Sequence, residues 1–251
     1  MQDNFKNIVK NILEEMGAEE IKTSLFINNS ILDDAGIDED SWEREAVRLE
    51  GSQGEEPVAL RTILTPGMLD MLGRNCLGGM RNLRYYEIGS TFMPSMTRSE
   101  NNGFPEESED LTIGICGGGD SFTILKEMIE NFLSNLGIEN VIFEPEAEYG
   151  VYNPEKCVRI ILDIGDENNG KEKMAELEEK VNNAGNEFGE AELQIMKDLV
   201  AALSGMTAEE QIEIGIMGEI HSEVAEKFGI SKGACCEIHF ETLEEFASKE
   251  A

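Results

Sequence analysis

The first residues of the chain carry an apolar stripe with helical spacing. Apolar side chains recur there at intervals of three and four residues, at Phe5, Ile8, Val9, Ile12, Leu13 and Met16. Gly17 can end such a helix. A second stripe of the same period follows Gly117-Gly118-Gly119, with Asp120 or Ser121 as its cap. Its apolar positions are Ile124, Leu125, Met128, Ile129, Phe132, Leu133 and Leu136. The pattern predicts two amphipathic helices.

Much of the remaining pattern alternates with the period of a half-buried strand. The clearest case is the strand predicted at 81–92, which places Tyr86 on one face and Glu87 on the other. The other predicted strands cover residues 20–27, 57–64, 111–115, 141–143, 158–163, 212–220 and 235–240. Because strands often follow one another directly, residues 1–251 are predicted to form one α+β domain with a mostly antiparallel sheet flanked by helices.

Two segments interrupt this alternation. Thr65 can cap a helix and Pro66 can occupy its first turn, just after the strand predicted at 57–64. From residue 166 to 210 the pattern also turns helical, and this stretch carries twelve carboxylates against four lysines. We interpret residues 166–210 as an acidic helical insertion between two adjacent strands.

The net charge of the chain argues against some classes of partner. The chain has 52 acidic and 20 basic side chains, which gives a formal net charge of −32. Nucleic acids and anionic lipid surfaces attract Lys and Arg, so this balance argues against both as partners. The sequence has no apolar run long enough to span a membrane, and its polar start predicts no signal peptide. Five scattered cysteines indicate reduced thiols, so a cytoplasmic location is expected.

Residues that support common kinds of catalysis are scarce. The only histidines are His221 and His239, and Cys235-Cys236 lacks the spacing of a zinc site, so no metal or other cofactor is predicted. The run 117–119 could hold an anion at a helix start, but it lacks the Lys and Ser/Thr of a phosphate loop. We interpret it as a glycine-rich turn.

Several segments, in order, are similar to one family. Residues 60–69 (LRTILTPGML), 74–75 (RN) and 85–92 (YYEIGSTF) resemble segments of the phenylalanyl-tRNA synthetase β chain. Residues 120–126 (DSFTILK) are similar to a helix start of the archaeal and eukaryotic type, and 214–224 (IGIMGEIHSEV) match a later motif. The residues matching these motifs include Pro66, Gly67, Gly89, Phe122, Lys126, Gly218, Glu219 and His221.

The resemblance implies the catalytic-like core module of that chain, built like a class II aminoacyl-tRNA synthetase. In this family the module does not aminoacylate but packs against a catalytic α chain through its first helix and the following strand. The expected interface residues are therefore Phe5, Ile8, Val9, Ile12, Leu13 and Met16, facing an α chain or a second copy of this chain. Direct tRNA binding is not expected at this net charge.

The resemblance also bears on catalysis. Class II enzymes bind ATP with an arginine in a strand of the form FRxE and with a second arginine near the end of the core. Here Arg84 and Glu87 occupy the nearest strand, and residues 240–251 contain no arginine. The resemblance therefore implies no catalytic residues and a module that is inactive by itself.

Alternatives stay open at this level. Arg61, Arg84 and Glu87 could line a pocket in a stand-alone class II paralogue that binds or activates an amino acid. A third hypothesis is a regulatory module that senses an amino acid and signals through residues 166–210. Departures from the family motifs, such as Asn153-Pro154-Glu155-Lys156 and His221-Ser222, leave both a fragment of a longer subunit and a stand-alone paralogue possible.

Overall fold

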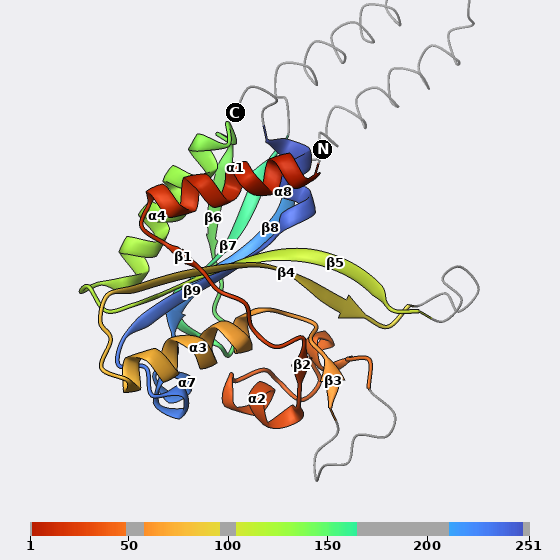
Figure 1. The fold of residues 1–251 in the computed structure, drawn as a ribbon, viewed down its shortest axis with the longest axis vertical. Helices are drawn as coiled ribbons and strands as arrows, with labels where there is room; N and C mark the ends of the chain where they lie inside the picture. Colours follow the sequence, from red (N-terminus) through yellow and green to blue (C-terminus); the bar gives the residue numbers. More distant parts are fainter. Residues whose placement is uncertain (1, 49–57, 96–103, 165–210, 248–251) are drawn as a thin grey trace, which may run out of the picture. The chain divides into compact units, whose positions relative to one another are not determined.

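Strands far apart in the sequence form one large sheet. The computed structural model describes residues 2–48, 58–95, 104–164 and 211–247. Within these ranges the sheet has the strand order β1-β4-β5-β9-β8-β7-β6 (Figure 1). Its strands are β1 (Glu19–Glu20), β4 (Leu83–Met93), β5 (Glu106–Cys116), β6 (Val141–Pro145), β7 (Tyr152–Asp163), β8 (Gln211–Ile220) and β9 (Gly233–His239). β1 is parallel to β4, whereas β4–β5, β5–β9 and β8–β9 are antiparallel. The predicted α+β fold with a mostly antiparallel sheet is confirmed.

The register of the central strands defines two faces of this sheet. Glu87 of β4, Thr112 of β5 and Glu237 of β9 lie in one cross-strand row. The preceding residue on β4, Tyr86, points to the opposite face, as successive side chains of a strand must. Helix α3 (Thr65–Leu77) packs on the side of Glu87, and α1 (Gln2–Glu15) packs on the side of Tyr86. We call these sides the α3 face and the α1 face.

Helix α1 lies on the α1 face together with α4 (Ser121–Asn135) and α8 (Phe240–Phe246) (Figure 1). Helix α1 buries Phe5, Val9 and Leu13, and the Phe5 ring packs against Phe240 of α8 at 5.4 Å. The second predicted amphipathic helix is α4. Its buried side chains include Leu125, Met128, Ile129, Phe132 and Leu133. Both amphipathic helices form as their apolar periods predicted.

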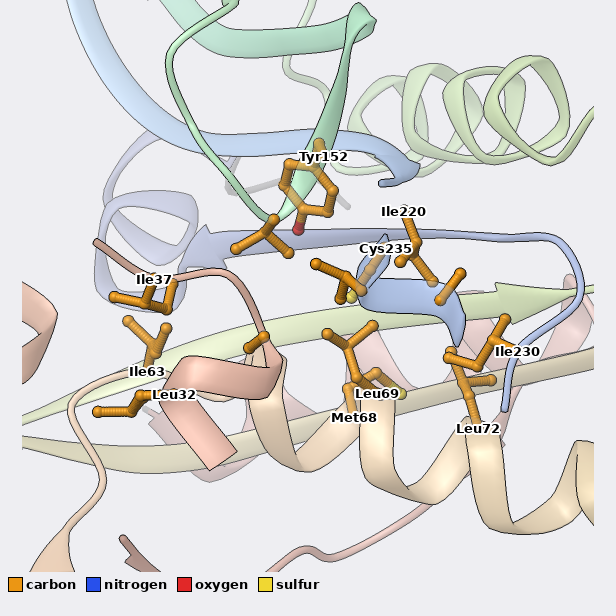
Figure 2. Packing of buried hydrophobic residues seen from close by; sticks show 14 of the residues in the cluster. Leu32, Ile37, Ile63, Met68, Leu69, Leu72, Tyr152, Ile220, Ile230 and Cys235 are labelled. Carbon is orange, nitrogen blue, oxygen red and sulfur yellow. The ribbon is translucent and has the colours of Figure 1, made fainter. Parts of the chain in front are cut away.

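One hydrophobic core lies between the sheet and α3, with α2 (Asn29–Asp34) and α7 (Ser222–Phe228) beside it. Met68, Leu69 and Leu72 of α3 pack there with residues of the sheet and its connections, among them Tyr152, Ile220, Ile230 and Cys235 (Figure 2). A side chain at Gly114 of β5 would bring a Cβ within 2.7 Å of the Met68 sulfur. The missing side chain therefore allows α3 to approach the sheet closely.

The segment 20–27 does not form the single strand that its pattern predicted. It divides into β1 and β2 (Phe26–Ile27), and β2 pairs with β3 (Ala59–Leu60) in a separate two-stranded sheet. The ladder pairing of β1 with β4 ends at Glu20, and Thr23 then donates its backbone N–H and its hydroxyl to the Glu87 carboxylate. The strand predicted at 57–64 is likewise reduced to β3.

The start of α3 is stabilised by a residue remote in sequence. Thr65 was the predicted cap, but the cap position is Leu64, which makes no side-chain cap bond. Instead, the backbone N–H groups of Leu64 and Thr65 both donate to Glu237 of β9 at 2.8 Å. A carboxylate at a helix N-terminus satisfies free N–H groups and interacts favourably with the helix dipole.

Some predictions fall outside the residues described. The helices predicted at 166–210 lie outside the described residues. The acidic insertion and the single-domain organisation therefore stay predictions. The contacts divide the chain into Met1–Ile161 with Glu213–Ala251, and Leu162–Ile212. All residues of the sites below belong to the first unit. No helix in the described ranges has the length and apolar character needed to cross a membrane.

Candidate functional site

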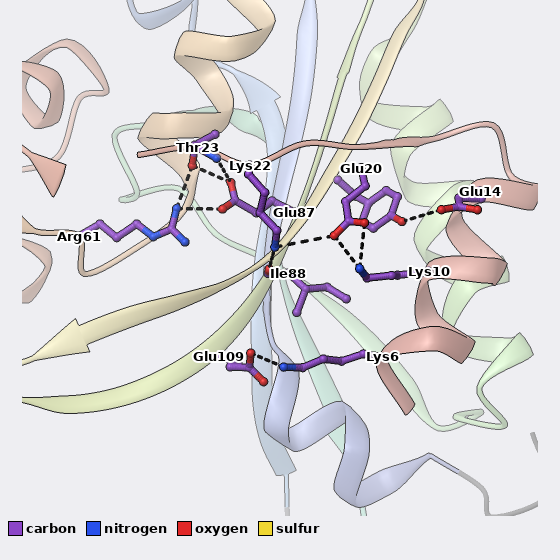
Figure 3. Close-up of polar contacts among 11 residues, drawn as sticks. Lys6, Lys10, Glu14, Glu20, Lys22, Thr23, Arg61, Glu87, Ile88 and Glu109 are labelled. Atoms are coloured by element: carbon purple, nitrogen blue, oxygen red, sulfur yellow. Dashed lines mark hydrogen bonds and ion pairs between the residues drawn. The ribbon is translucent and has the colours of Figure 1, made fainter. Parts of the chain in front are cut away.

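Two of the motif segments meet at a buried ion pair. Arg61 and Glu87 are almost completely buried, and Nη1 of Arg61 lies 3.0 Å from Oε1 of Glu87. Arg61 also donates to the Ser90 carbonyl at 2.8 Å and to the Thr23 hydroxyl at 2.9 Å. The Thr23 hydroxyl in turn donates to Glu87 at 2.6 Å (Figure 3). These bonds join the segments 60–69 and 85–92 and compensate the charge of each buried group.

The glycines of these motifs make room for the ion pair. A Cβ at Gly89 would lie 2.3 Å from Nη2 of Arg61, and a Cβ at Gly67 would lie 2.6 Å from the Thr23 hydroxyl. Pro66 is buried beside Gly67 in the first turn of α3. Packing around Arg61, Thr23 and Glu87 therefore gives a structural reason for the two glycines.

Arg84 does not join the pocket that was predicted for it with Arg61 and Glu87. Arg84 and Glu87 are three residues apart on β4, so their side chains point to opposite faces of the sheet. Arg84 is exposed and donates to the Met16 carbonyl at 2.9 Å, near the end of α1. The structure thus brings Arg61 and Glu87 together and places Arg84 elsewhere.

The later motif residues hold strands and helix ends in place. Gly218 of β8 faces Tyr152, which a Cβ there would approach to 2.6 Å. Glu219 pairs with Lys156 of β7 at 2.9 Å. His221 caps α7 by accepting a hydrogen bond from the Glu223 backbone at 3.3 Å. Each contact stabilises the connection between β8 and its neighbours.

The motif residues of α4 have a similar role. Phe122 is half-buried in the first turn of the helix. Lys126 pairs with Glu130 at 3.0 Å and lies 4.8 Å from the centre of the Phe143 ring on β6. A lysine over an aromatic face at this distance adds a modest cation–π attraction, which ties α4 to the edge of the sheet.

The α3 face also has a cavity of about 480 Å³, which we call the acidic pocket. Seven carboxylates line it: Asp38, Glu43, Asp110, Glu146, Glu148, Glu213 and Glu237. The basic side chains in its lining are Arg159 and His239. Arg159 approaches Glu146 and Glu213 at 3.5 Å, and His239 lies 2.9 Å from Asp110. The lining therefore carries far more negative than positive charge.

Three side chains of the acidic pocket have raised pKa values. Burial, together with the Asp110 carboxylate, raises the pKa of Glu237 to about 7, against the hydrogen bonds from Leu64 and Thr65 that favour its ionised form. The hydrogen bond to Asp110 raises the pKa of His239. Burial raises the pKa of Glu43, which is 3% exposed. The pocket can therefore gain or lose protons close to neutral pH.

Sequence reasoning missed the acidic pocket. Its carboxylates come from segments spread between residues 38 and 237, so no single local motif contains them. One signal was available at Glu237, a charged residue within the otherwise apolar strand segment 233–238. A charged residue at such a position needs a partner, and here the partner is the start of α3. Among the described residues, no group of three or more His, Cys, Asp or Glu is placed to hold a metal ion.

The predicted interface residues of α1 occupy two sides of the helix. Phe5, Val9 and Leu13 are buried within the chain itself. Ile8, Ile12 and Met16 are half-buried. The fold thus accounts for the first three side chains, and only the second three keep apolar surface that another chain could cover.

The fold of this chain is similar to that of solved aminoacyl-tRNA synthetase structures. A crystal structure of pyrrolysyl-tRNA synthetase from Desulfitobacterium hafniense has the same fold, with a TM-score of 0.61 at 15% identity. That match covers 96% of this chain and 67% of the other. The sheet and its flanking helices therefore form a core of the class II aminoacyl-tRNA synthetase type.

The family follows from the sequence comparisons. Residues 1–240 match the model of the phenylalanyl-tRNA synthetase β chain CLM domain, and the chain belongs to this family. It is 32% identical to the phenylalanine–tRNA ligase β subunit of Clostridium acetobutylicum over 157 residues, which are 62% of this chain and 19% of that subunit. The subunit of Carboxydothermus hydrogenoformans is 32% identical over 173 residues, and that of Thermococcus sibiricus 26% over 161. The matched region spans about a fifth to a quarter of these relatives' length.

Proposed function

We propose that this chain is a β-type core module that is catalytically inactive by itself and acts through protein contacts in a synthetase-type assembly. The observation that carries this proposal is the acidic pocket on the α3 face. Its seven carboxylates would repel the phosphates of ATP. Transition states of phosphoryl and acyl transfer need preorganised cations or hydrogen-bond donors, and the residues that resemble the class II arginines do not supply them here.

The positive groups near the pocket are already engaged. Arg159 pairs with Glu144, Glu146 and Glu213, and His239 is bound to Asp110. Arg61 is buried against Glu87, and Arg84 points to the other face. An ATP molecule in the pocket would therefore meet uncompensated carboxylates. This arrangement supports an inactive module and gives no support to amino-acid activation.

The interaction role concerns α1. The half-buried flank formed by Ile8, Ile12 and Met16 runs along the helix beside its buried line. We infer that this flank contacts a synthetase α chain, or a second copy of this chain. Removing apolar area from water stabilises such a contact by about 25 cal/mol per Å². The relatives' name, phenylalanine–tRNA ligase β subunit, supports an α-type partner.

Two measurements test this proposal. ATP–pyrophosphate exchange with each amino acid should give no signal above the protein-free background. The chain should also co-purify with a phenylalanine–tRNA ligase α subunit, and Ile12→Asp should abolish that co-purification. Asn11→Asp is the matched control, since it adds the same charge at an exposed position of the same helix. Pyrophosphate exchange, or equal retention of both variants, would contradict the proposal.

A second candidate function is supported by the same pocket. Seven carboxylates, with the exposed Trp42 and the half-buried Tyr149 in the lining, would attract the ammonium group of an amino acid. The module could then sense an amino acid without activating it. Thermal-shift measurements with the amino acids, in the presence and absence of ATP, distinguish the two functions. A shift with an amino acid alone would favour sensing.

Further parts of the proposal follow from family membership and charge. The net charge of −32 argues against direct tRNA contact by this module and is in keeping with a cytoplasmic role in translation. The resemblance of residues 120–126 to the archaeal and eukaryotic type stays a prediction, as relatives come from bacteria and from an archaeon. A filter-binding assay with tRNA at low salt should show no retention.

A further inference from the structure

The charged side chains that line a second cavity are mostly basic, whereas the chain as a whole is strongly acidic. It measures about 440 Å³, lies between α1 and β4, and is lined by Lys6, Lys10, Lys22 and Arg61 together with Glu87 and Glu109. We call it the lysine pocket. We propose that the lysine pocket receives Asp or Glu side chains from an acidic, partly apolar segment of a partner polypeptide. This inference rests on the proposed interaction role and specifies the chemistry of the partner.

The concentration of cations is the first argument. The whole chain has 20 basic side chains against 52 acidic ones, and four of the basic ones line this single cavity. With Glu87 and Glu109, the charged side chains of the lining carry a net charge of +2, and Glu20, which pairs with Lys10 and lies 3.8 Å from Lys22, lowers the local balance to +1. A locally positive cavity in a strongly negative protein attracts anions selectively and steers their approach.

The ammonium groups keep hydrogen-bonding capacity. Lys6 pairs with Glu109 at 2.5 Å, Lys10 pairs with Glu20 at 2.8 Å, and Lys22 donates to the Ile88 carbonyl (Figure 3). Each ammonium has three N–H groups, so these contacts with described residues leave donors available. The Lys22 side chain is 62% exposed, that of Lys10 is 32% exposed and that of Lys6 is 27% exposed. The donors can therefore reach a ligand.

The same geometry favours the carboxylates of a polypeptide over a free inorganic anion. The guanidinium of Arg61 is held by Glu87, Ser90 and Thr23, so the lysine ammonium groups are the donors that can reach a ligand. A small positive charge in the lining suits one or two carboxylates. Leu25, which lines the pocket, is 43% exposed, and the neighbouring Phe26 is 51% exposed. A polypeptide can offer acidic and apolar side chains together, whereas a free anion cannot.

The lysine pocket and the proposed interface lie on opposite flanks of α1. Lys6 and Lys10 are each two positions before Ile8 and Ile12, a separation that puts the two pairs on different sides of a helix. Lys22 and Leu25 belong to the segment that follows β1 along the chain. A partner that covers the apolar flank of α1 could thus extend over the helix and place an acidic segment against the lysines.

Anisotropy measurements with a fluorescein-labelled peptide of alternating Glu and Leu test this inference. The variant is Lys6→Gln with Lys22→Gln, and the control is Lys227→Gln with Lys232→Gln, which removes the same charge from exposed positions elsewhere. We expect the pocket variant to bind the peptide about tenfold more weakly and the control to change binding less than about twofold. A Gln–Leu peptide should not bind. Equal binding by both double variants, binding of the Gln–Leu peptide, no binding at all, or equally effective competition by inorganic phosphate would overturn the inference.

The same variants separate this inference from the proposed function. If Ile12→Asp abolishes co-purification with the α subunit while Lys6→Gln with Lys22→Gln binds the acidic peptide normally, the interaction role stands and the lysine pocket does not. If the peptide result is as expected but no α subunit co-purifies, the pocket stands with a different partner. Unfolding midpoints within about 2 °C of wild type verify that both double variants are folded.

Discussion

Glu87 and Glu237 occupy the same cross-strand row on the α3 face, one on each side of Thr112, yet the fold stabilises them differently. Glu87 is compensated by a formal charge, since Arg61 lies 3.0 Å away in the interior. Glu237 has no basic partner among its described contacts and accepts hydrogen bonds from Leu64 and Thr65 at the start of α3. A full opposite charge and a helix N-terminus are two ways to stabilise a carboxylate inside a fold.

The two carboxylates have one structural effect in common. Arg61, Leu64 and Thr65 all belong to the segment 60–69, so both glutamates fasten the same stretch of chain to the sheet. This segment was the first part of the family resemblance. Its residues hold α3 and the two-stranded sheet against the large sheet, and none of these contacts requires a substrate. The difference predicts that the Glu87 contact is costly to break and that the Glu237 contact responds to pH.

Removing the cation beside Glu87 should have the largest effect. Arg61→Met keeps the length of the side chain but leaves Glu87 buried without its charge partner, so we expect a loss of about 3–5 kcal/mol in the free energy of unfolding. Urea denaturation followed by circular dichroism measures this loss. Arg61→Met combined with Glu87→Met should recover part of the stability, because two apolar side chains then replace two charges.

An exposed ion pair provides the control for this prediction. Arg74 and Asp70 lie on the surface of α3, four residues apart and 2.8 Å from each other. Arg74→Met should change the free energy of unfolding by less than about 1 kcal/mol. Equal losses for Arg61→Met and Arg74→Met would mean that burial does not distinguish the two pairs.

Crowding the same ion pair should have a smaller effect. Gly89→Ala would place a Cβ 2.3 Å from the Arg61 guanidinium, which must then move from its partners. We expect a loss of about 1–3 kcal/mol in the free energy of unfolding, as for other overpacked interiors. Gly78→Ala is the comparison, since its Cβ would meet nothing closer than 3.3 Å and φ is −69°. Thermal unfolding that ranks Gly78→Ala as the more damaging change would contradict this account.

The sequence predicted those parts of the fold that depend on local periodicity. The stripes of α1 and α4 and the alternation of β4 specify their buried faces, because the chain buries the same positions whatever lies opposite. The division of residues 20–27 was not predictable in this way. The segment contains Thr23, which binds Glu87, 64 positions further along the chain. The start of α3 depends on Glu237, 172 positions beyond Thr65.

The candidate sites also depend on contacts between remote residues, which local sequence patterns do not predict. The resemblance pointed to Arg61 and Glu87, but strand parity, which the alternation of 81–92 already contained, separates Arg84 from them. The acidic pocket and the lysine pocket gather side chains from segments with no common spacing, so only the folded chain reveals them. The net charge of the chain includes the side chains of both pockets, so it could not reveal that the two linings differ in the sign of their charge.

The pH response of Glu237 should be the smallest of the three effects. Its pKa is raised from 4.5 to about 7 in the folded state, so the folded chain binds more protons than the unfolded chain between these values. The free energy of unfolding should therefore fall by about 1–2 kcal/mol as the pH rises from about 5.5 to 7, and the raised pKa of His239 acts in the same direction. Glu237→Gln should flatten this dependence in urea titrations, even though it loses a hydrogen-bond acceptor at every pH. Glu155→Gln, at an exposed position, should keep the wild-type slope. If Glu237→Gln keeps it too, the carboxylate is ionised throughout, and the start of α3 stabilises it as fully as Arg61 stabilises Glu87.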